Sequence, residues 1–437
     1  MTDANRTYDI VVWGATGVAG RFVAEYLTEA YTPDELSLAI GGRSPDRLET
    51  LAADLADRTD AWDDVPVLIG DATDRESLHA IAQRTRVVCT TVGPYTTYGT
   101  PLVDACIEAG TDYCDLTGEI TWVREIIDRY HEAAVDAGVR IVHSCGFDSV
   151  PADLGTLLAQ SFAMETFDAP CQTVRIYLED GSGSVSGGTL ASFAELFEAA
   201  ATDPLASQTV QNPYSLAPPG ERSGVDPGEQ RRPRRDPLRS AWTAPSPMAA
   251  VNERVVRRSN AVLGYPWGRE FRCTEVVPTG NGVSGAVTAG LVAGGIGAFT
   301  AAMSVGPVRS VLQKHVFPAL GEGPTRAEAN AGHFQVRVLG RGVATDGPFT
   351  VDVAFGADRD PGYGATARML GESAVCLATA DVDSPLAGGV MTPASGIGLP
   401  LVDRLRAAEF TITVDEAADP YRGGTVRGAP SESSSGS

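Results

Sequence analysis

Short apolar runs and longer amphipathic stretches alternate over the first 145 residues. Between the runs, apolar residues recur at helical spacing, as Phe22, Val23 and Tyr26 do after the first run. Strands that alternate with helices in this way predict an α/β fold built on a doubly wound parallel sheet. The runs are rich in β-branched residues, which is typical of buried strands, and they lie at 8–13, 36–40, 67–69, 87–92, 113–116 and 139–144.

A glycine-rich turn joins the first predicted strand to its helix. Gly14 permits the tight turn, Gly17 lets the backbone approach a pyrophosphate, and Gly20 allows the helix to pack closely on the sheet. The helix N-terminus then offers free N–H groups and a partial positive charge to phosphates. The pattern predicts a dinucleotide site, with a close-packed turn that binds nothing as the alternative. The cofactor-binding residues expected here are Gly14, Ala15, Thr16, Gly17 and Val18.

The ends of the second and third strands indicate which dinucleotide binds. A domain for NAD places an acid about 20 residues past the glycines, where it holds the ribose 2′-hydroxyl. This chain has Arg43 followed by Ser44, and a guanidinium beside a hydroxyl suits a 2′-phosphate. We therefore predict NADPH (NADP) as the cofactor, with a solvated surface arginine as the alternative. After the third strand, Asp71 and Ala72 are expected beside the adenine.

The loop after the fourth strand is expected to face the nicotinamide, because the carboxyl ends of parallel strands line the ligand crevice. Its residues Gly93, Pro94 and Tyr95 are predicted to contact the cofactor. Tyr95 and Tyr98 are the candidate catalytic residues, since a tyrosine hydroxyl can donate a proton. Packing against the cofactor is the alternative for both.

Four residues are candidates for binding the substrate. Phe147 and Asp148 follow the sixth strand, at a predicted hinge into a second domain, and Asp148 is interpreted as an orienting carboxylate or a helix N-cap. Gly188 and Thr189 stand at a predicted helix start, where backbone N–H groups could hold a substrate carboxylate or thioester oxygen. A plain helix start is the equal alternative for that pair.

Two segments of the second half have unusual compositions. Residues 204–247 are rich in proline and predict a lid-like loop, whose arginines at 231–235 either hold an anionic substrate tail or, as we favour, pair with the acidic surface. Residues 276–308 carry no charge. They predict a buried Gly/Ala helix or the lining of an apolar tunnel first, an interfacial segment that meets lipid second, and a membrane span last.

Together these motifs resemble the saccharopine dehydrogenase-like oxidoreductases, specifically the branch that contains trans-acting enoyl reductases. The similarity rests on several short motifs in family-like order and spacing, and no single one of them is specific. They lie at 14–20, 41–44, 92–95 with 98–99, 105–113, 115–119, 145–151 and 187–189.

The resemblance implies an NADP-type Rossmann domain at 1–148, a second α/β domain at 149–392 and a segment at 393–422 that returns to the first domain. Residues 423–437 are expected to form a disordered tail. The implied activity is NADPH-dependent reduction of a lipid-like or acyl substrate at an enoyl double bond. The alternatives are an amino-acid (saccharopine-type) dehydrogenase acting on a C–N bond, and a non-catalytic, lipid- or membrane-associated nucleotide-binding protein.

The excess of acidic over basic residues indicates which solvent and which partners suit this protein. The 437 residues include 34 basic and 56 acidic side chains, for a formal charge of −22, and Lys314 is the single lysine. Such a chain is expected to stay soluble in concentrated salt, as in a halophile, because salt screens the repulsion among its negative charges. The alternative, a GC-rich genome, would explain the shortage of lysine but not the excess of acids. Nucleic acid is excluded as the main partner, because a polyanion would be repelled.

Cysteine and histidine patterns indicate the compartment. Seven cysteines occur without a CxxC pair, which favours buried thiols in a reducing, cytoplasmic setting, and the five histidines form no metal-binding spacing, so no metal is expected. The polar N-terminus lacks the features of a signal peptide. The expected partner is a small acyl substrate, and peripheral membrane contact and a homodimer remain open.

Overall fold

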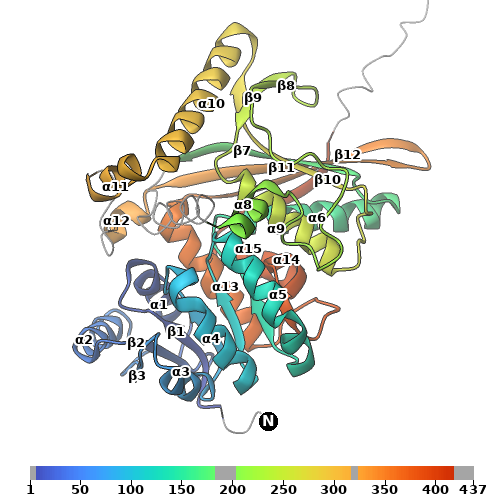
Figure 1. Ribbon diagram of the computed structural model, residues 1–437. Helices are drawn as coiled ribbons and strands as arrows, with labels where there is room; N and C mark the ends of the chain where they lie inside the picture. Colours follow the sequence, from blue (N-terminus) through green and yellow to red (C-terminus); the bar gives the residue numbers. More distant parts are fainter. Residues whose placement is uncertain (1–5, 183–202, 316–322, 418–437) are drawn as a thin grey trace, which may run out of the picture.

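The computed structural model describes residues 6–182, 203–315 and 323–417 (Figure 1). Its first sheet has seven parallel strands in the order β13-β6-β5-β4-β1-β2-β3, which confirms the predicted α/β fold with a doubly wound sheet. The elements in chain order are β1 (Tyr8–Trp13), α1 (Val18–Ala30), β2 (Leu38–Gly42), α2 (Pro45–Ala56), β3 (Val67–Ile69), α3 (Arg75–Ala82), β4 (Thr85–Thr90), α4 (Tyr95–Ala109), β5 (Asp112–Asp115), α5 (Ile120–Ala137) and β6 (Arg140–Val142).

Alternate residues of each strand face opposite layers of helices. In β1, Ile10 and Val12 belong to a core shared with α1 and α2, whereas Val11 and Trp13 belong to a core shared with α3, α4 and α5. This is the pattern of a sheet buried on both faces, in which strands are apolar throughout. All seven cysteines are buried free thiols, as the sequence predicted.

A second, mixed sheet has the order β14-β12-β11-β7-β10-β9-β8. Strands β7 and β10 run parallel, and the other described pairs are antiparallel. Helices α6 (Val150–Phe167) and α9 (Ala249–Val262) pack on it. Its strands are β7 (Thr173–Ser182), β8 (Arg234–Asp236), β9 (Ala241–Pro245), β10 (Arg272–Gly280), β11 (His333–Ala344), β12 (Gly347–Ala357) and β14 (Thr411–Glu416).

The return to the first domain begins earlier than the predicted boundary at 392/393. After α12 (Arg326–Ala329) and η2 (Pro361–Ala365), α13 (Thr366–Ala378) packs on the first sheet, and β13 (Gly389–Met391) pairs with β6. An unpaired β6 would leave a buried strand with an open edge, which β13 closes. Helices α14 (Pro393–Gly396) and α15 (Leu399–Ala407) follow, and β14 then joins the second sheet. The predicted tail lies outside the described residues.

The segment at 204–247 is folded onto the body and is not the lid-like loop that its proline content predicted. It contains α8 (Pro204–Gln211), β8 and β9. Buried arginines of α9 bind its backbone: Arg254 donates to the carbonyl oxygens of Val210 at 2.5 Å and Asn212 at 3.1 Å. Arg258 donates to the carbonyl oxygens of Leu216 and Val390. These main-chain contacts give order to a segment without hydrophobic periodicity.

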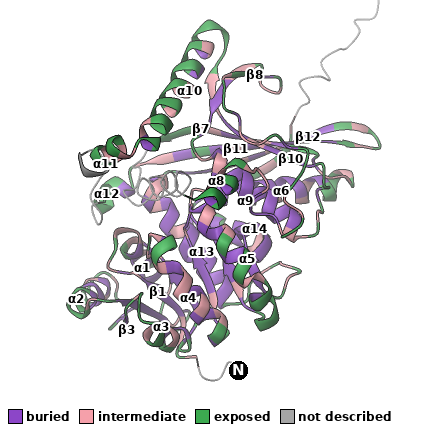
Figure 2. Ribbon diagram, in the orientation of Figure 1, coloured by how far each residue is buried: buried purple, intermediate pink, exposed green. Residues whose placement is uncertain are grey.

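The uncharged segment forms α10 (Gly282–Ser304), which projects from the second sheet and leads into α11 (Gly306–His315) (Figure 1). The first prediction, a buried helix or tunnel lining, is wrong. Most of α10 is exposed (Figure 2), with Val283 81% and Leu291 72% exposed. Within the described part of the chain, α10 alone has the length and hydropathy of a membrane span. The helix packs against β9 and β10, where Gly285 and Ala289 are buried, but most of its other residues are exposed.

Candidate functional site

The glycine turn after β1 has the shape of a phosphate cradle. Gly14 has a φ of +86°, a conformation that favours glycine. A Cβ on Gly20 would lie 2.3 Å from the Gly14 carbonyl oxygen, so α1 can approach the turn only with glycine there. Gly17 is the exposed N-cap of α1 and supplies no side-chain cap. The first N–H groups of α1 are therefore open to an anion.

The ends of β2 and β3 form the adjoining part of this site. Arg43 follows β2, is exposed, and makes no ion pair with any described residue. Ser44 is the N-cap of α2 but its hydroxyl makes no capping bond. Hydrogen bonds from Thr73 hold the pKa of Asp71 below its ordinary value, and the charge of Arg43 adds to the effect. An unpaired guanidinium beside a free hydroxyl fits the 2′-phosphate of NADPH, and the cradle fits its pyrophosphate.

Glu119 holds the start of α4, the loop predicted to face the nicotinamide. The helix begins after Pro94, which has no side chain able to cap it. The Glu119 carboxylate accepts instead from the backbone N–H groups of Tyr95 at 3.0 Å and Thr96 at 2.8 Å, and from the Thr96 hydroxyl at 2.5 Å. Glu119 lies in the loop after β5 and is buried. A carboxylate from the next strand end thus fixes the loop that carries Gly93 and Pro94.

The structure argues against Tyr95 as a proton donor. Its side chain is buried and stacked on Trp122, with ring centroids 5.4 Å apart, and its hydroxyl donates to the carbonyl oxygen of Thr90 at 3.2 Å. Burial raises the pKa of Tyr95 well above its ordinary value. Its role is to pack the core below the loop. Tyr98, one turn further along α4, is partly exposed and stays a prediction.

A buried network joins the loops after β5 and β6. Asp115 accepts from His143 Nδ1 at 2.7 Å and from the Tyr113 hydroxyl at 2.8 Å, and its other oxygen accepts from the backbone N–H groups of Thr117 and Ser144. The Ser144 hydroxyl also donates to the Thr117 carbonyl oxygen at 2.7 Å. Because these contacts are buried, they fix the loops that carry Glu119 and Phe147.

Phe147 and Asp148 line a small cavity between the end of β6 and the second sheet. Its volume is about 20 Å³, room for about one water molecule. The polar groups on its wall are Asp148, Asn252 and Glu275, and the rest of the lining is apolar: Phe147, Pro151, Ala152, Ile176, Leu178, Met248 and Val336. An acyl substrate is much larger than this volume, so the walls of the cavity would have to move to admit one.

The acids in this cavity are held in an apolar surrounding. Glu275 accepts from the Ser246 hydroxyl and from Asn252 Nδ2 at 2.6 Å, and Asn252 Oδ1 accepts from the Ser149 hydroxyl at 2.9 Å. Burial raises the pKa of Asp148 to about 6. Burial, together with the charge of Asp148, also raises the pKa of Glu275. Burial therefore favours the protonated form of both carboxyl groups.

Sequence reasoning found only part of this cavity. Phe147 and Asp148 lie in it as candidate substrate residues, whereas Gly188 and Thr189 lie outside the described residues. Asn252 and Glu275 were missed, although a lone acid at the edge of an uncharged stretch is a signal that could have marked Glu275. Asp148 is not the N-cap of α6, which is Ser149, and its carboxylate forms no hydrogen bond or ion pair with any of the described residues.

Comparison with known proteins identifies the family. Residues 10–142 match the domain described as the saccharopine dehydrogenase NADP binding domain. The chain is 39% identical to a Mycobacterium tuberculosis protein that carries the name "putative trans-acting enoyl reductase", over 96% of this chain and 100% of that protein. It is 37% identical to the trans-acting enoyl reductase of Mycobacterium bovis, over 93% and 98%. The chain belongs to the trans-acting enoyl reductase family.

The family assignment agrees with the site described above. The protein is an NAD(P)-dependent oxidoreductase with an NADP-type Rossmann domain, as the glycine turn and Arg43 predicted. Among solved structures, apo saccharopine dehydrogenase (L-Glu forming) from Saccharomyces cerevisiae aligns with 94% of this chain and 99% of its own, at 12% identity and a TM-score of 0.49.

Proposed function

We propose that this protein uses NADPH to reduce the carbon–carbon double bond of an enoyl group in an acyl substrate. The observation that carries the proposal is the composition of the cavity beside the end of β6, whose walls are apolar and whose charged groups are acids. The family supports it, because relatives 37–39% identical over nearly the full chain are named trans-acting enoyl reductases.

The same cavity argues against the amino-acid dehydrogenase alternative. A substrate with two or more carboxylates would need arginine or lysine side chains to bind it. None of the described residues that line the cavity is cationic, and Asp148 and Glu275 would repel a carboxylate. An uncharged acyl chain meets no such penalty.

In the proposed reaction, the cofactor supplies the hydride and residues of the chain supply the proton and hold the cofactor. NADPH, when bound, supplies a hydride to the β-carbon of the enoyl group. The glycine turn and Arg43 hold the dinucleotide, and Glu119 fixes the loop beside it. Asp148, protonated, donates its proton to the α-carbon, and Glu275 next to it keeps that proton on the carboxyl pair by repelling a second negative charge. Tyr98 is the alternative donor.

The test is NADPH oxidation with enoyl thioesters of increasing chain length, set against dicarboxylic amino acids with a keto acid partner. We expect turnover with the thioesters, and a kcat/KM that falls as the pH rises above about 6, because Asp148 must be protonated. Asp148→Asn should lower kcat by about 10²-fold or more and remove this pH dependence. Asp415→Asn, an exposed acid on β14, is the matched control.

Each other outcome has a distinct meaning. Turnover of the amino acids alone would overturn the enoyl proposal, and NADPH binding without turnover of any substrate would favour the non-catalytic alternative. A normal rate in Asp148→Asn with a large loss in Tyr98→Phe would transfer the proton step to Tyr98 without affecting the proposed reaction.

We further propose that the enzyme works in the cytoplasm and touches a lipid surface through α10. Residues 276–308 carry no charge, and α10 is exposed along most of its length. A helix that is apolar all round is stable only where something apolar surrounds it, and a lipid-like substrate would be found at such a surface. The acidic surface outside α10 would keep the protein soluble in concentrated salt, where charge repulsion is screened. Unfolding measured over a series of KCl concentrations would test this adaptation to salt.

A further inference from the structure

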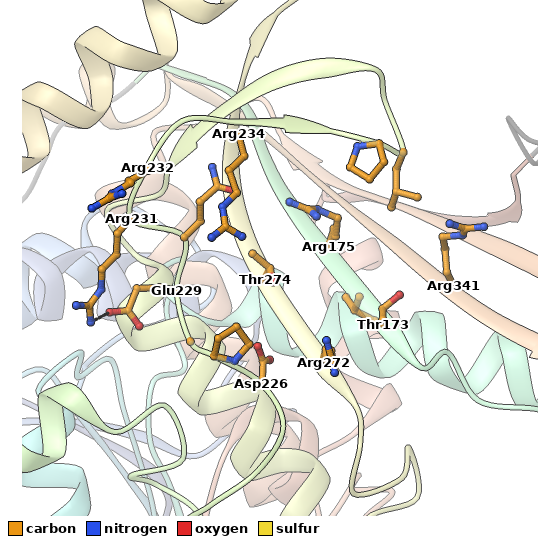
Figure 3. A pocket seen from close by; sticks show the side chains of 16 residues that line it. Thr173, Arg175, Asp226, Glu229, Arg231, Arg232, Arg234, Arg272, Thr274 and Arg341 are labelled. Carbon is orange, nitrogen blue, oxygen red and sulfur yellow. Dashed lines mark hydrogen bonds and ion pairs between the residues drawn. The ribbon is translucent and has the colours of Figure 1, made fainter.

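Six arginines surround a second cavity, of about 720 Å³, on the second sheet (Figure 3). It lies on the opposite face of that sheet from the cavity of Asp148. Thr274 lines this arginine cavity, whereas its neighbour Glu275 lines the cavity of Asp148. On β7, Arg175 likewise lines the arginine cavity and Ile176 the cavity of Asp148. Successive side chains of a strand point to opposite faces of its sheet. The six are Arg175, Arg231, Arg232, Arg234, Arg272 and Arg341.

The floor of this arginine cavity is built by strand register. On β7, Thr173 pairs with Arg272 of β10 on one side and with Arg341 of β11 on the other. In the next row, Arg175 pairs with Thr274. Since neighbouring strands lie about 4.8 Å apart, the row from Arg341 to Arg272 spreads hydrogen-bond donors over about 10 Å.

The segment from Asp226 to Leu238 forms the opposite wall. In Figure 3, Arg234 lies above Thr274, while Arg231 reaches toward Glu229. The acids of this wall already have partners: Asp226 pairs with Arg257 of α9 at 2.8 Å, and Glu229 pairs with Arg231 at 2.9 Å. Asp236, in the same segment, pairs with Arg175 at 3.3 Å. The acids of this wall therefore neutralise Arg231 and Arg175 and leave Arg232 and Arg234 without an acid partner among the described residues.

Three of the arginines have no carboxylate partner among the described residues. Arg232, Arg234 and Arg272 form no ion pair with any residue in the part of the chain that the structure describes. Like charges held together raise the free energy of the folded state, and this protein has 56 acids from which partners could come. The sequence interpretation that these arginines pair with the acidic surface therefore fails for Arg232 and Arg234.

We propose that the arginine cavity binds a small organic ligand that carries a diphosphate group. Guanidinium and threonine hydroxyl groups are donors that suit phosphate oxygens. Their spread of about 10 Å exceeds what one phosphate can contact, and the cavity volume is in the usual range for small-ligand sites. The site is separate from the cofactor cradle, which lies at the end of β1 in the other domain.

The test is calorimetric titration of the NADPH-saturated protein with inorganic pyrophosphate and with inorganic phosphate, at constant ionic strength. Saturation with NADPH blocks the cradle, so pyrophosphate reports on the arginine cavity. We expect pyrophosphate to bind at one site, at least about tenfold more tightly than phosphate, because two charged groups are held. Arg234→Gln and Arg272→Gln, from opposite walls, should each weaken it about tenfold.

Arg235→Gln is the matched control, because Arg235 is the exposed neighbour of Arg234 on β8 and does not line the cavity. The proposal is overturned if NADPH binds at one site per chain and pyrophosphate does not bind to the saturated protein, or if all three variants bind pyrophosphate equally. If NADPH binds at two sites per chain and Arg234→Gln removes one of them, the result supports the proposed site. It also identifies the dinucleotide as the ligand that brings the diphosphate group.

Discussion

At the scale of the residue, we expect the choice of cofactor to depend on Arg43. It follows β2, is exposed and has no carboxylate partner among the described residues, whereas the glycine turn and α1 would treat NADPH and NADH alike. The extra phosphate of NADPH is therefore expected to interact chiefly with this guanidinium and with the Ser44 hydroxyl.

Replacing Arg43 with alanine should weaken NADPH binding by about 1.5–3 kcal/mol, the value of hydrogen bonds to a charged group, and leave NADH binding unchanged. Fluorescence titration with each cofactor measures both constants. Arg47 gives the contrast: its guanidinium donates to the Thr16 carbonyl oxygen at 2.8 Å, so Arg47→Ala should weaken both cofactors together. Equal losses for the two cofactors in Arg43→Ala would contradict the assignment.

At the scale of the element, α4 depends on a residue outside itself. Its N-cap is a proline, and Glu119 from the loop after β5 accepts the N–H groups that a capping side chain would ordinarily bind. The position of the nicotinamide loop is thus set by a contact between two strand ends.

Glu119→Ala should lower the free energy of unfolding by about 2–4 kcal/mol, because it leaves the buried N–H groups of Tyr95 and Thr96 without an acceptor. Urea denaturation measures this. Glu119→Gln keeps one acceptor oxygen and should cost less. In Glu125→Ala, which removes an exposed ion pair with Arg129 on α5, we expect a change of less than about 1 kcal/mol. Similar effects in Glu119→Ala and Glu125→Ala would exclude the capping role.

How far the sequence predicted these elements depends on whether their signal is local. The strands and the glycine turn of the first domain follow from periodicity and a local motif, and the structure confirms them. The capping by Glu119, the meeting of Asp148 and Glu275 in one cavity and the burial of Tyr95 depend on the packing of distant segments, which no local pattern reveals. For α10, composition could not distinguish an exposed apolar helix from a buried one, because both require the same residues.

For the molecule as a whole, α10 is the feature that packing within one chain does not explain. It rises 1.5 Å per residue over 23 residues, about 34 Å in total, with Val287 57% and Leu291 72% exposed. A net charge of −22 would repel anionic lipid, so contact with a neutral surface is expected to be the stronger.

Phosphatidylcholine vesicles should carry the protein upward in a flotation gradient. Leu291→Asp should abolish flotation, since a charge in an apolar interface is costly, and should leave NADPH binding intact. Val343→Asp, at an exposed valine of β11, is the matched control and should float. If the wild type stays at the bottom and size-exclusion chromatography shows a dimer that Leu291→Asp dissociates, a second copy of the chain covers α10 and the lipid proposal is wrong.

The order in which the chain is synthesised gives β13 a further significance. This strand completes the edge of the first sheet beside β6, and the Val390 carbonyl oxygen accepts from Arg258 of α9, yet the whole second sheet except β14 is made before it. A nascent chain that has exposed only the nucleotide-binding residues would carry an open strand edge until residue 391 leaves the ribosome. The cofactor domain, first in the sequence, is therefore expected to be among the last parts of the protein to reach its final structure, and shortening the chain at residue 148 should produce an aggregating fragment, not an independent domain.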